Sequence, residues 1–369
     1  MAGIYIHIPF CRKKCHYCNF HFTTSLYYKD DLVKAIANEI SLQKDYLQNE
    51  RVETIYFGGG TPSLLNIEDV VLILDRVRRY FQITDNPEIT LETNPDDITE
   101  EKIIGWKEAG INRLSIGIQS FFEEDLQWMN RAHNTQQAKE NLLLAKKHFD
   151  NITIDLIYGT PGLSNEEWKQ NVDTAIALKI PHLSCYALTV EPKTPLDKLI
   201  RQKKKEDVNP DKQSEQFLLL MDWMEKAGYE HYEISNFSLP GWRSRHNSSY
   251  WSGKHYLGIG PSAHSFNGTT RQWNIANNNI YIESVRLGKV PFEKEQLTST
   301  QQLNEYIMTA IRTAEGIDLV RLRKKEADSI LQKSKRYLES ALIEQRNNHL
   351  ILTREGKLLA DGIAAALFF

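Results

Sequence analysis

Short apolar segments alternate with longer amphipathic ones from Met1 to about Gly228. The short segments are rich in β-branched and aromatic residues, which favour strands, whereas the longer ones repeat apolar residues at helical spacing. The predicted strands begin near Ala2, Thr54, Glu88, Arg113, Ile152 and His182, and the clearest helical patterns cover Lys29–Leu47, Ile67–Phe81, Glu166–Leu178 and Lys212–Ala227. This alternation indicates βα units around a parallel sheet. Because six units fall short of the eight that close a full barrel, we expect a partial (βα)6 barrel in residues 1–230.

The alternation ends before the last part of the chain. Residues 231–299 lack the repeat and are predicted to connect two modules. In residues 300–369, helical patterns cover Gln301–Ala314 and Lys324–Gln345, a hairpin is expected at Asn347-Asn348, and a further helix follows Gly356. The order helix, helix, hairpin, helix resembles a winged helix, which by itself does not establish a function. The predicted fold class is therefore α/β, a partial barrel with a C-terminal α+β region that ends in a winged-helix-like module.

Residues suited to ligand binding recur where the predicted strands end, which is where parallel α/β sheets bind their ligands. The first strand leads into Cys11, Cys15 and Cys18, and the second leads into Gly58-Gly-Gly-Thr-Pro62. Glycines let a ligand approach the backbone closely, although a glycine run also suits a tight turn. The polar residues at the next three strands are Glu92, Gln119 and Asp155. Each alone fits a hydrogen-bonded sheet-end residue, but their recurrence favours a binding site.

The three clustered cysteines predict an inorganic centre. Three thiolates on one loop can hold an iron–sulfur cluster, and a cluster of four irons would keep one iron open for another ligand. A zinc site completed by His16 or His21 is the alternative, although the three-then-two spacing differs from the usual two-cysteine knuckles. The fourth cysteine, Cys185, stands apart and is expected to be dispensable.

Composition narrows the expected location and partners of the protein. At 369 residues with 41% hydrophobic content, the chain can form one large domain and a smaller one. Its net charge of −3 gives no basic surface for general nucleic-acid binding. No signal-peptide pattern, apolar run of membrane-spanning length or secreted disulfide framework is present. We therefore expect a cytoplasmic protein without a nucleic-acid partner, and leave peripheral membrane association and a homodimer open.

The segment Tyr5-Ile-His-Ile-Pro-Phe-Cys11, with Cys15 and Cys18, resembles the beginning of radical S-adenosylmethionine (SAM) enzymes. Nearly the whole chain resembles their HemN-like branch, which includes oxygen-independent coproporphyrinogen III oxidases and the HemW haem chaperones. The resemblance implies that the three cysteines hold a 4Fe–4S cluster whose open iron is chelated by SAM. It implies SAM contacts for Tyr5, Gly59, Gly60, Thr61 and Glu92, and positions near a second SAM site for Gln119, Arg131 and Asp155.

Three features are similar to the chaperone branch rather than the oxidases. Phe20 stands where a family oxidase has a cysteine, and the cysteine loop begins without the oxidase's long N-terminal extension. The segment His246-Asn247-Ser-Ser-Tyr250-Trp251 matches the chaperone motif HNxxYW. Imidazole can ligate haem iron, and aromatic faces suit a porphyrin, so the resemblance implies haem contacts for these four residues. Without the resemblance, His246 would be an ordinary loop histidine, and we interpret His264 as structural.

The resemblance implies a haem chaperone that carries a SAM-coordinated 4Fe–4S cluster and delivers haem to apo-haemoproteins such as respiratory enzymes. No residue is assigned as catalytic. The alternative is a radical SAM coproporphyrinogen III oxidase, which would decarboxylate porphyrinogen propionates. A zinc-bound nucleic-acid adaptor has little support in the charge or the cysteine spacing.

Overall fold

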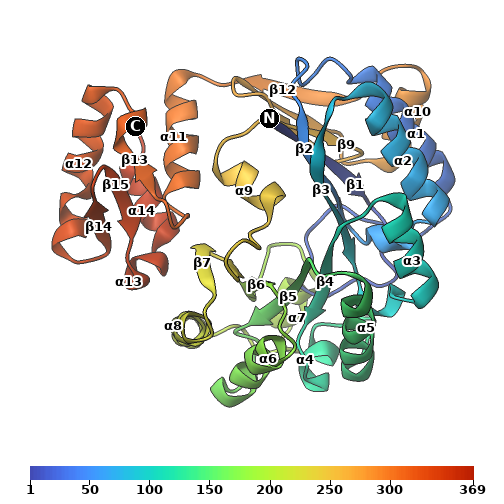
Figure 1. Ribbon diagram of the computed structural model, residues 1–369. Coiled ribbons are helices and arrows are strands. Elements are labelled where there is room, and N and C mark those ends of the chain that lie inside the picture. The colour runs from blue at the N-terminus through green and yellow to red at the C-terminus, as the bar shows by residue number, and fades with distance from the viewer.

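The computed structural model describes residues 1–369, and six parallel strands form the centre of its main sheet (Figure 1). They lie side by side in chain order and are β1 (Ala2–Ile8), β2 (Val52–Gly59), β3 (Ile83–Thr93), β4 (Arg113–Gln119), β5 (Ile152–Tyr158) and β6 (His182–Ala187). All six predicted strands and the parallel sheet are confirmed. The sheet stays open, because its outermost strands do not pair with each other.

Helices follow the strands and cover one face of the sheet (Figure 1). They are α1 (Lys29–Leu42), α2 (Ile67–Tyr80), α3 (Glu100–Ala109), α4 (Glu123–Trp128), α5 (Thr135–His148), α6 (Asn165–Ala177), α7 (Pro195–Arg201) and α8 (Pro210–Lys226), with short 3-10 turns at Pro62–Leu64 and Pro95–Asp97. The first helix ends at Leu42 rather than Leu47, and turns follow it as far as Gln48 and Asn49, which have positive φ angles. All of these helices except α4 and α7 share with the strands one hydrophobic core of 56 buried residues, which makes the sheet a rigid platform for the loops at its carboxyl edge. Leu126 of α4 and Leu196 of α7 belong to a separate cluster of five buried residues.

Residues 231–299 are not a linker in the structure, because they extend the main sheet at both edges. Two strands, β7 (Glu230–Glu233) and β8 (Asn236–Ser238), follow β6, and β8 pairs with it antiparallel. After α9 (Arg245–Trp251), the strand β9 (Tyr256–Ile259) pairs parallel with β1. The remaining elements are β10 (His264–Phe266), β11 (Thr270–Asn274), α10 (Asn278–Arg286) and β12 (Phe292–Gln296). The full sheet therefore has 12 strands.

A buried carboxyl group joins this extension to the barrel. Glu39 on α1 accepts hydrogen bonds from Gly260 N at 2.8 Å and Asn274 Nδ2 at 2.7 Å, and from the hydroxyl of Tyr281 on α10. Burial raises the pKa of Glu39 to about 7. Three donors to one buried carboxyl group hold β9 to β11 in place beside β1.

The C-terminal module has a core of its own, with 12 buried residues. Its elements are α11 (Ser299–Ala310), β13 (Ile317–Asp318), a 3-10 turn at Leu319–Arg321, α12 (Lys324–Glu339), β14 (Ile343–Arg346), β15 (His349–Leu352), α13 (Arg354–Lys357) and α14 (Ala360–Leu367). The predicted hairpin is confirmed, but the helix predicted to reach Gln345 ends at Glu339, because Ala341 has a positive φ angle and β14 begins at Ile343. None of the helices combines the length and the apolar character that crossing a membrane requires.

Candidate functional site

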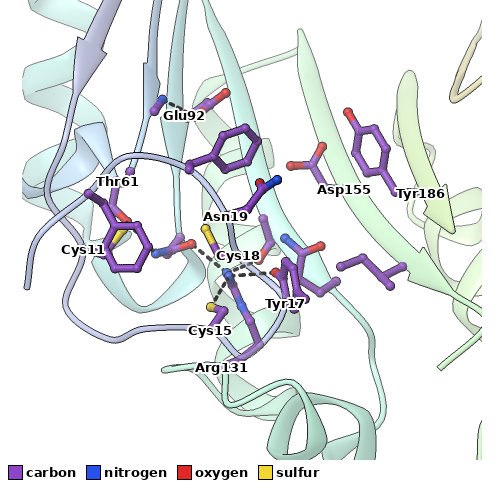
Figure 2. Close-up of a pocket in the computed structure, with 18 of the residues that line it drawn as sticks. Cys11, Cys15, Tyr17, Cys18, Asn19, Thr61, Glu92, Arg131, Asp155 and Tyr186 are labelled. Carbon is purple, nitrogen blue, oxygen red and sulfur yellow. Dashed lines mark hydrogen bonds between the residues drawn. The ribbon is translucent and has the colours of Figure 1, made fainter. Parts of the chain in front are cut away.

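The three clustered cysteines line one cavity of about 380 Å³ at the carboxyl edge of the parallel strands (Figure 2). All three are free and partly buried. Their loop is held by backbone hydrogen bonds at several points, among them Cys11 N to Thr23 O at 3.0 Å and Thr61 N to Phe10 O at 2.7 Å. The loop is therefore fixed to β2 as well as to its own strand, β1.

Polar groups surround the sulfur atoms. The hydroxyl of Thr61 lies 3.5 Å from Cys11 Sγ, and Arg131 Nη1 lies 3.3 Å from Cys15 Sγ. Asn94 links the two, since its Nδ2 donates to Thr61 Oγ1 at 3.1 Å and its Oδ1 accepts from Arg131 Nη2 at 2.7 Å. The Nε of Arg131 is buried without a partner. The guanidinium of Arg131 places a positive charge beside the sulfurs, which fits a negatively charged thiolate-bound cluster.

The histidines of the zinc alternative are engaged elsewhere. His16 Nδ1 lies 3.0 Å from Trp128 O, and His21 Nε2 lies 2.8 Å from Asn278 Oδ1. Neither residue lines the cavity of the cysteines. Of the cysteine and histidine side chains, this cavity therefore offers three sulfurs and no imidazole, which fits an iron–sulfur cluster with one open position.

The glycine turn and Glu92 form the neighbouring wall of the same cavity. Glu92 Oε1 accepts from the hydroxyl of Tyr56 at 2.7 Å, and Oε2 accepts from Gly59 N at 3.2 Å. Burial raises the pKa of Glu92 to about 7. A Cβ atom at Gly60 would stand 2.6 Å from the carbonyl oxygen of Phe10. Substitution at Gly60 would therefore also displace the cysteine loop, so Glu92 offers the cleaner test of ligand binding at this wall.

Of the other residues expected near SAM, Gln119, Arg131 and Asp155 line this cavity and Tyr5 does not. Gln119 ends β4 with a φ angle of +68°, and burial raises the pKa of Asp155 to about 6. Tyr5 stacks against Tyr56 in an adjoining cavity, with ring centroids 6.1 Å apart.

Sequence reasoning missed several residues of the cavity, among them Tyr17, Asn94 and Tyr186. Asn94 and Tyr186 lie at the carboxyl ends of β3 and β6, where the strand-end rule applies to them as well. Tyr17 lies between two of the cysteines, and its hydroxyl is 3.4 Å from Arg131 Nη1 (Figure 2). The strand-end positions of Asn94 and Tyr186, and the position of Tyr17 between two cysteines, could therefore have identified these residues from the sequence.

The environment of His246 differs from that of an accessible haem ligand. The residue lies on α9 and is 1% exposed. Its Nδ1 lies 2.8 Å from Thr54 Oγ1, and its Nε2 lies 2.9 Å from the hydroxyl of Tyr250. Burial lowers the pKa of His246 to about 3. Both ring nitrogens are thus engaged within the fold, and neither is free for iron in this conformation.

The four motif residues also do not face one space. His246, Asn247 and Tyr250 line a narrow cavity with Tyr5 and Phe20, whereas Trp251 lines a cleft of about 510 Å³ toward the C-terminal module. Successive helical residues point about 100° apart, which separates Tyr250 from Trp251. A single haem cannot contact all four side chains in this arrangement.

Comparison with known proteins identifies the family. Residues 5–175 match the model of the radical SAM superfamily, and residues 297–359 match that of the HemN C-terminal domain. The haem chaperone HemW of Mycobacterium tuberculosis is 33% identical over 99% of this chain and 94% of its own length, and that of Bacillus subtilis is 33% identical over 99% of both. HemW of Escherichia coli is 38% identical over 71% of this chain and 69% of its own.

A solved structure shares the fold. Coproporphyrinogen III oxidase (HemN) from Escherichia coli superposes with a TM-score of 0.85 at 22% identity, covering all of this chain (100%) and 90% of that one. At this identity the likeness supports the architecture alone, and the relatives of higher identity decide the family. The chain therefore belongs to the HemW haem chaperone family within the radical SAM superfamily.

Proposed function

We propose that this protein binds haem and delivers it to apo-haemoproteins, such as respiratory enzymes, in the cytoplasm. The observation that carries the proposal is similarity to haem chaperones over 99% of the chain. Phe20 adds support, because an aromatic ring occupies the place of the oxidase cysteine and lines the cysteine cavity. No residue is proposed to catalyse a reaction on the haem.

We further propose that Cys11, Cys15 and Cys18 hold a 4Fe–4S cluster and that SAM binds beside it. When bound, such a cluster supplies a single electron for reductive cleavage of SAM. Arg131 would balance the negative charge of the thiolates, since it already lies beside Cys15. The backbone of Gly59 to Thr61 and the carboxyl group of Glu92 would orient SAM, because they line the same cavity as the sulfurs.

SAM affinity is expected to rise as the pH increases from 6.5 to 8, because Glu92 ionises across this range. Burial raises the pKa of Glu92 to about 7, so the carboxyl group is neutral below that pH and attracts the cationic sulfonium of SAM above it. Glu92→Gln should bind SAM at least about tenfold more weakly at pH 8 and show a flatter dependence on pH. Calorimetry on reconstituted protein checks this, and equal slopes for the variant and the wild type would contradict it.

The test of function compares two activities of one preparation. Anaerobically reconstituted protein is expected to bind haem stoichiometrically and to transfer it to an apo-haemoprotein. With reductant, SAM and coproporphyrinogen III, it should release no carbon dioxide, while a coproporphyrinogen oxidase assayed in parallel does. Decarboxylation without haem transfer would replace the chaperone proposal by the oxidase.

A further inference from the structure

A cavity with aromatic walls adjoins the cysteine site. This space, here called the aromatic cavity, measures about 460 Å³ and is lined by residues that include Tyr5, Phe20, His21, Tyr250, Tyr256 and His264. It shares Tyr5, Phe20 and Tyr250 with the narrow cavity in front of His246. That narrow cavity in turn shares Phe20, Gly59 and Glu92 with the cysteine cavity. Three linked cavities thus lead from the cysteines to His264.

The walls of the aromatic cavity suit a flat, conjugated ligand. Tyr250 and Tyr256 meet edge to face with ring centroids 4.6 Å apart. Phe20 lies on the cysteine loop at the junction of the three cavities and is 67% exposed. An exposed phenylalanine that lines a cavity buries its ring only when something covers it. A porphyrin offers the broad apolar face that would do so.

The histidines around the aromatic cavity differ in how many of their ring nitrogens lack a hydrogen-bond partner. His7 has none, because Nδ1 lies 3.2 Å from the hydroxyl of Tyr5 and Nε2 lies 3.0 Å from His21 O. His21 has one nitrogen engaged by Asn278. The side chain of His264 is exposed, and no side-chain hydrogen bond acts on its ring nitrogens. Its ring stacks against Trp273 with centroids 6.3 Å apart, which orients the imidazole.

We infer that His264 is the axial ligand of the haem iron and that the haem lies in the aromatic cavity between His264 and Phe20. This inference rests on the proposed haem function and names the ligand and the place of binding. Iron is coordinated by a neutral imidazole, and the stacking on Trp273 fixes the orientation of the His264 ring. His246 then acts as a positioning residue, because its Nε2 holds the hydroxyl of Tyr250 in the wall.

The experiment is a titration of ferric haem into wild-type protein and variants with matched cluster content, followed by absorption and electron paramagnetic resonance. His264→Ala is expected to lose the signature of a histidine-ligated haem and to bind haem at least about tenfold more weakly, the loss that corresponds to one good contact. Imidazole added to this variant should restore the signature. Phe20→Ala should retain the histidine signature and bind more weakly, because it removes only an apolar face.

His349→Ala is the matched control, since His349 lines the separate cleft that contains Trp251. Its haem spectrum should equal that of the wild type, and melting curves of the three variants establish that they fold. A wild-type spectrum in His264→Ala, or loss of the histidine signature in His349→Ala, would overturn the inference while leaving the chaperone function intact. Absence of haem binding by the wild type would instead overturn the proposed function, so the two failures are distinguishable.

Discussion

Replacing any one of Cys11, Cys15 or Cys18 by alanine is expected to abolish the iron–sulfur cluster. The three thiols line one cavity, and the remaining cysteine cannot take over, because Cys185 is 1% exposed in β6. Nor is a histidine available in the cavity, since His16 and His21 lie outside it. Two protein ligands would then have to retain a cluster that is built for three.

Iron and acid-labile sulfide analysis after anaerobic reconstitution measures this loss, with the visible absorption of the cluster as a second readout. Cys185→Ala is the matched control, and it should keep the wild-type iron content with only a small loss of stability from its core contacts. Wild-type iron and sulfide in Cys15→Ala would refute the assignment of the ligands.

Glu88→Ala is expected to lower the free energy of unfolding by about 3–5 kcal/mol, the range for breaking a buried ion pair. Glu88 lies on β3 with 4% exposure, and its carboxylate lies 3.7 Å from Arg113 Nε, which is also buried. It accepts the backbone N–H groups of Arg245 at 3.0 Å and His246 at 2.9 Å, where α9 begins. The substitution would leave the Arg113 charge and two backbone donors unsatisfied at once.

Urea denaturation measures the effect, and Asp75→Ala provides the control. Asp75 pairs with Arg78 on the exposed face of α2, with 63% of its side chain exposed, so its loss should cost less than about 1 kcal/mol. Equal midpoints for the two variants would show that the Glu88 network adds no stability. A lower midpoint for Glu88→Ala alone would show that this buried network stabilises the fold.

The six parallel strands at the centre of the sheet could be predicted from local sequence patterns, whereas the strands added at its two edges could not. Strands such as β1 and β5 have seven residues each with nearly continuous burial, and long amphipathic helices separate the parallel strands. By contrast, β8 and β10 have three residues each. Runs this short carry no measurable periodicity, and the pairing of β8 with β6 joins residues that are more than 50 positions apart in the chain.

Residues of the candidate site could be predicted where they lie on one loop or at the ends of strands. They could not be predicted where their state depends on side chains distant in the sequence. Cys11, Cys15 and Cys18 lie on one loop, and Glu92 and Asp155 lie on β3 and β5, the two strands that flank β4, so topology brings them together. The state of His246 depends on Thr54, which is 192 residues away in the chain. The exposure of His264 likewise depends on how β10 packs, and no local pattern distinguishes it from a structural histidine.

The pairing of β1 with β9 has a consequence for how the protein is made. Gly3 of β1 pairs with Tyr256, and His21 on the cysteine loop contacts Asn278. Because synthesis proceeds from the N-terminus, β1 remains an open edge on the ribosome until residue 259 has emerged. The cysteine loop likewise lacks its last anchor until Asn278 is available. A cluster assembled on a nascent chain would be held by a loop that lacks one of its anchors. We therefore expect stable cluster insertion only after most of the polypeptide has been synthesised.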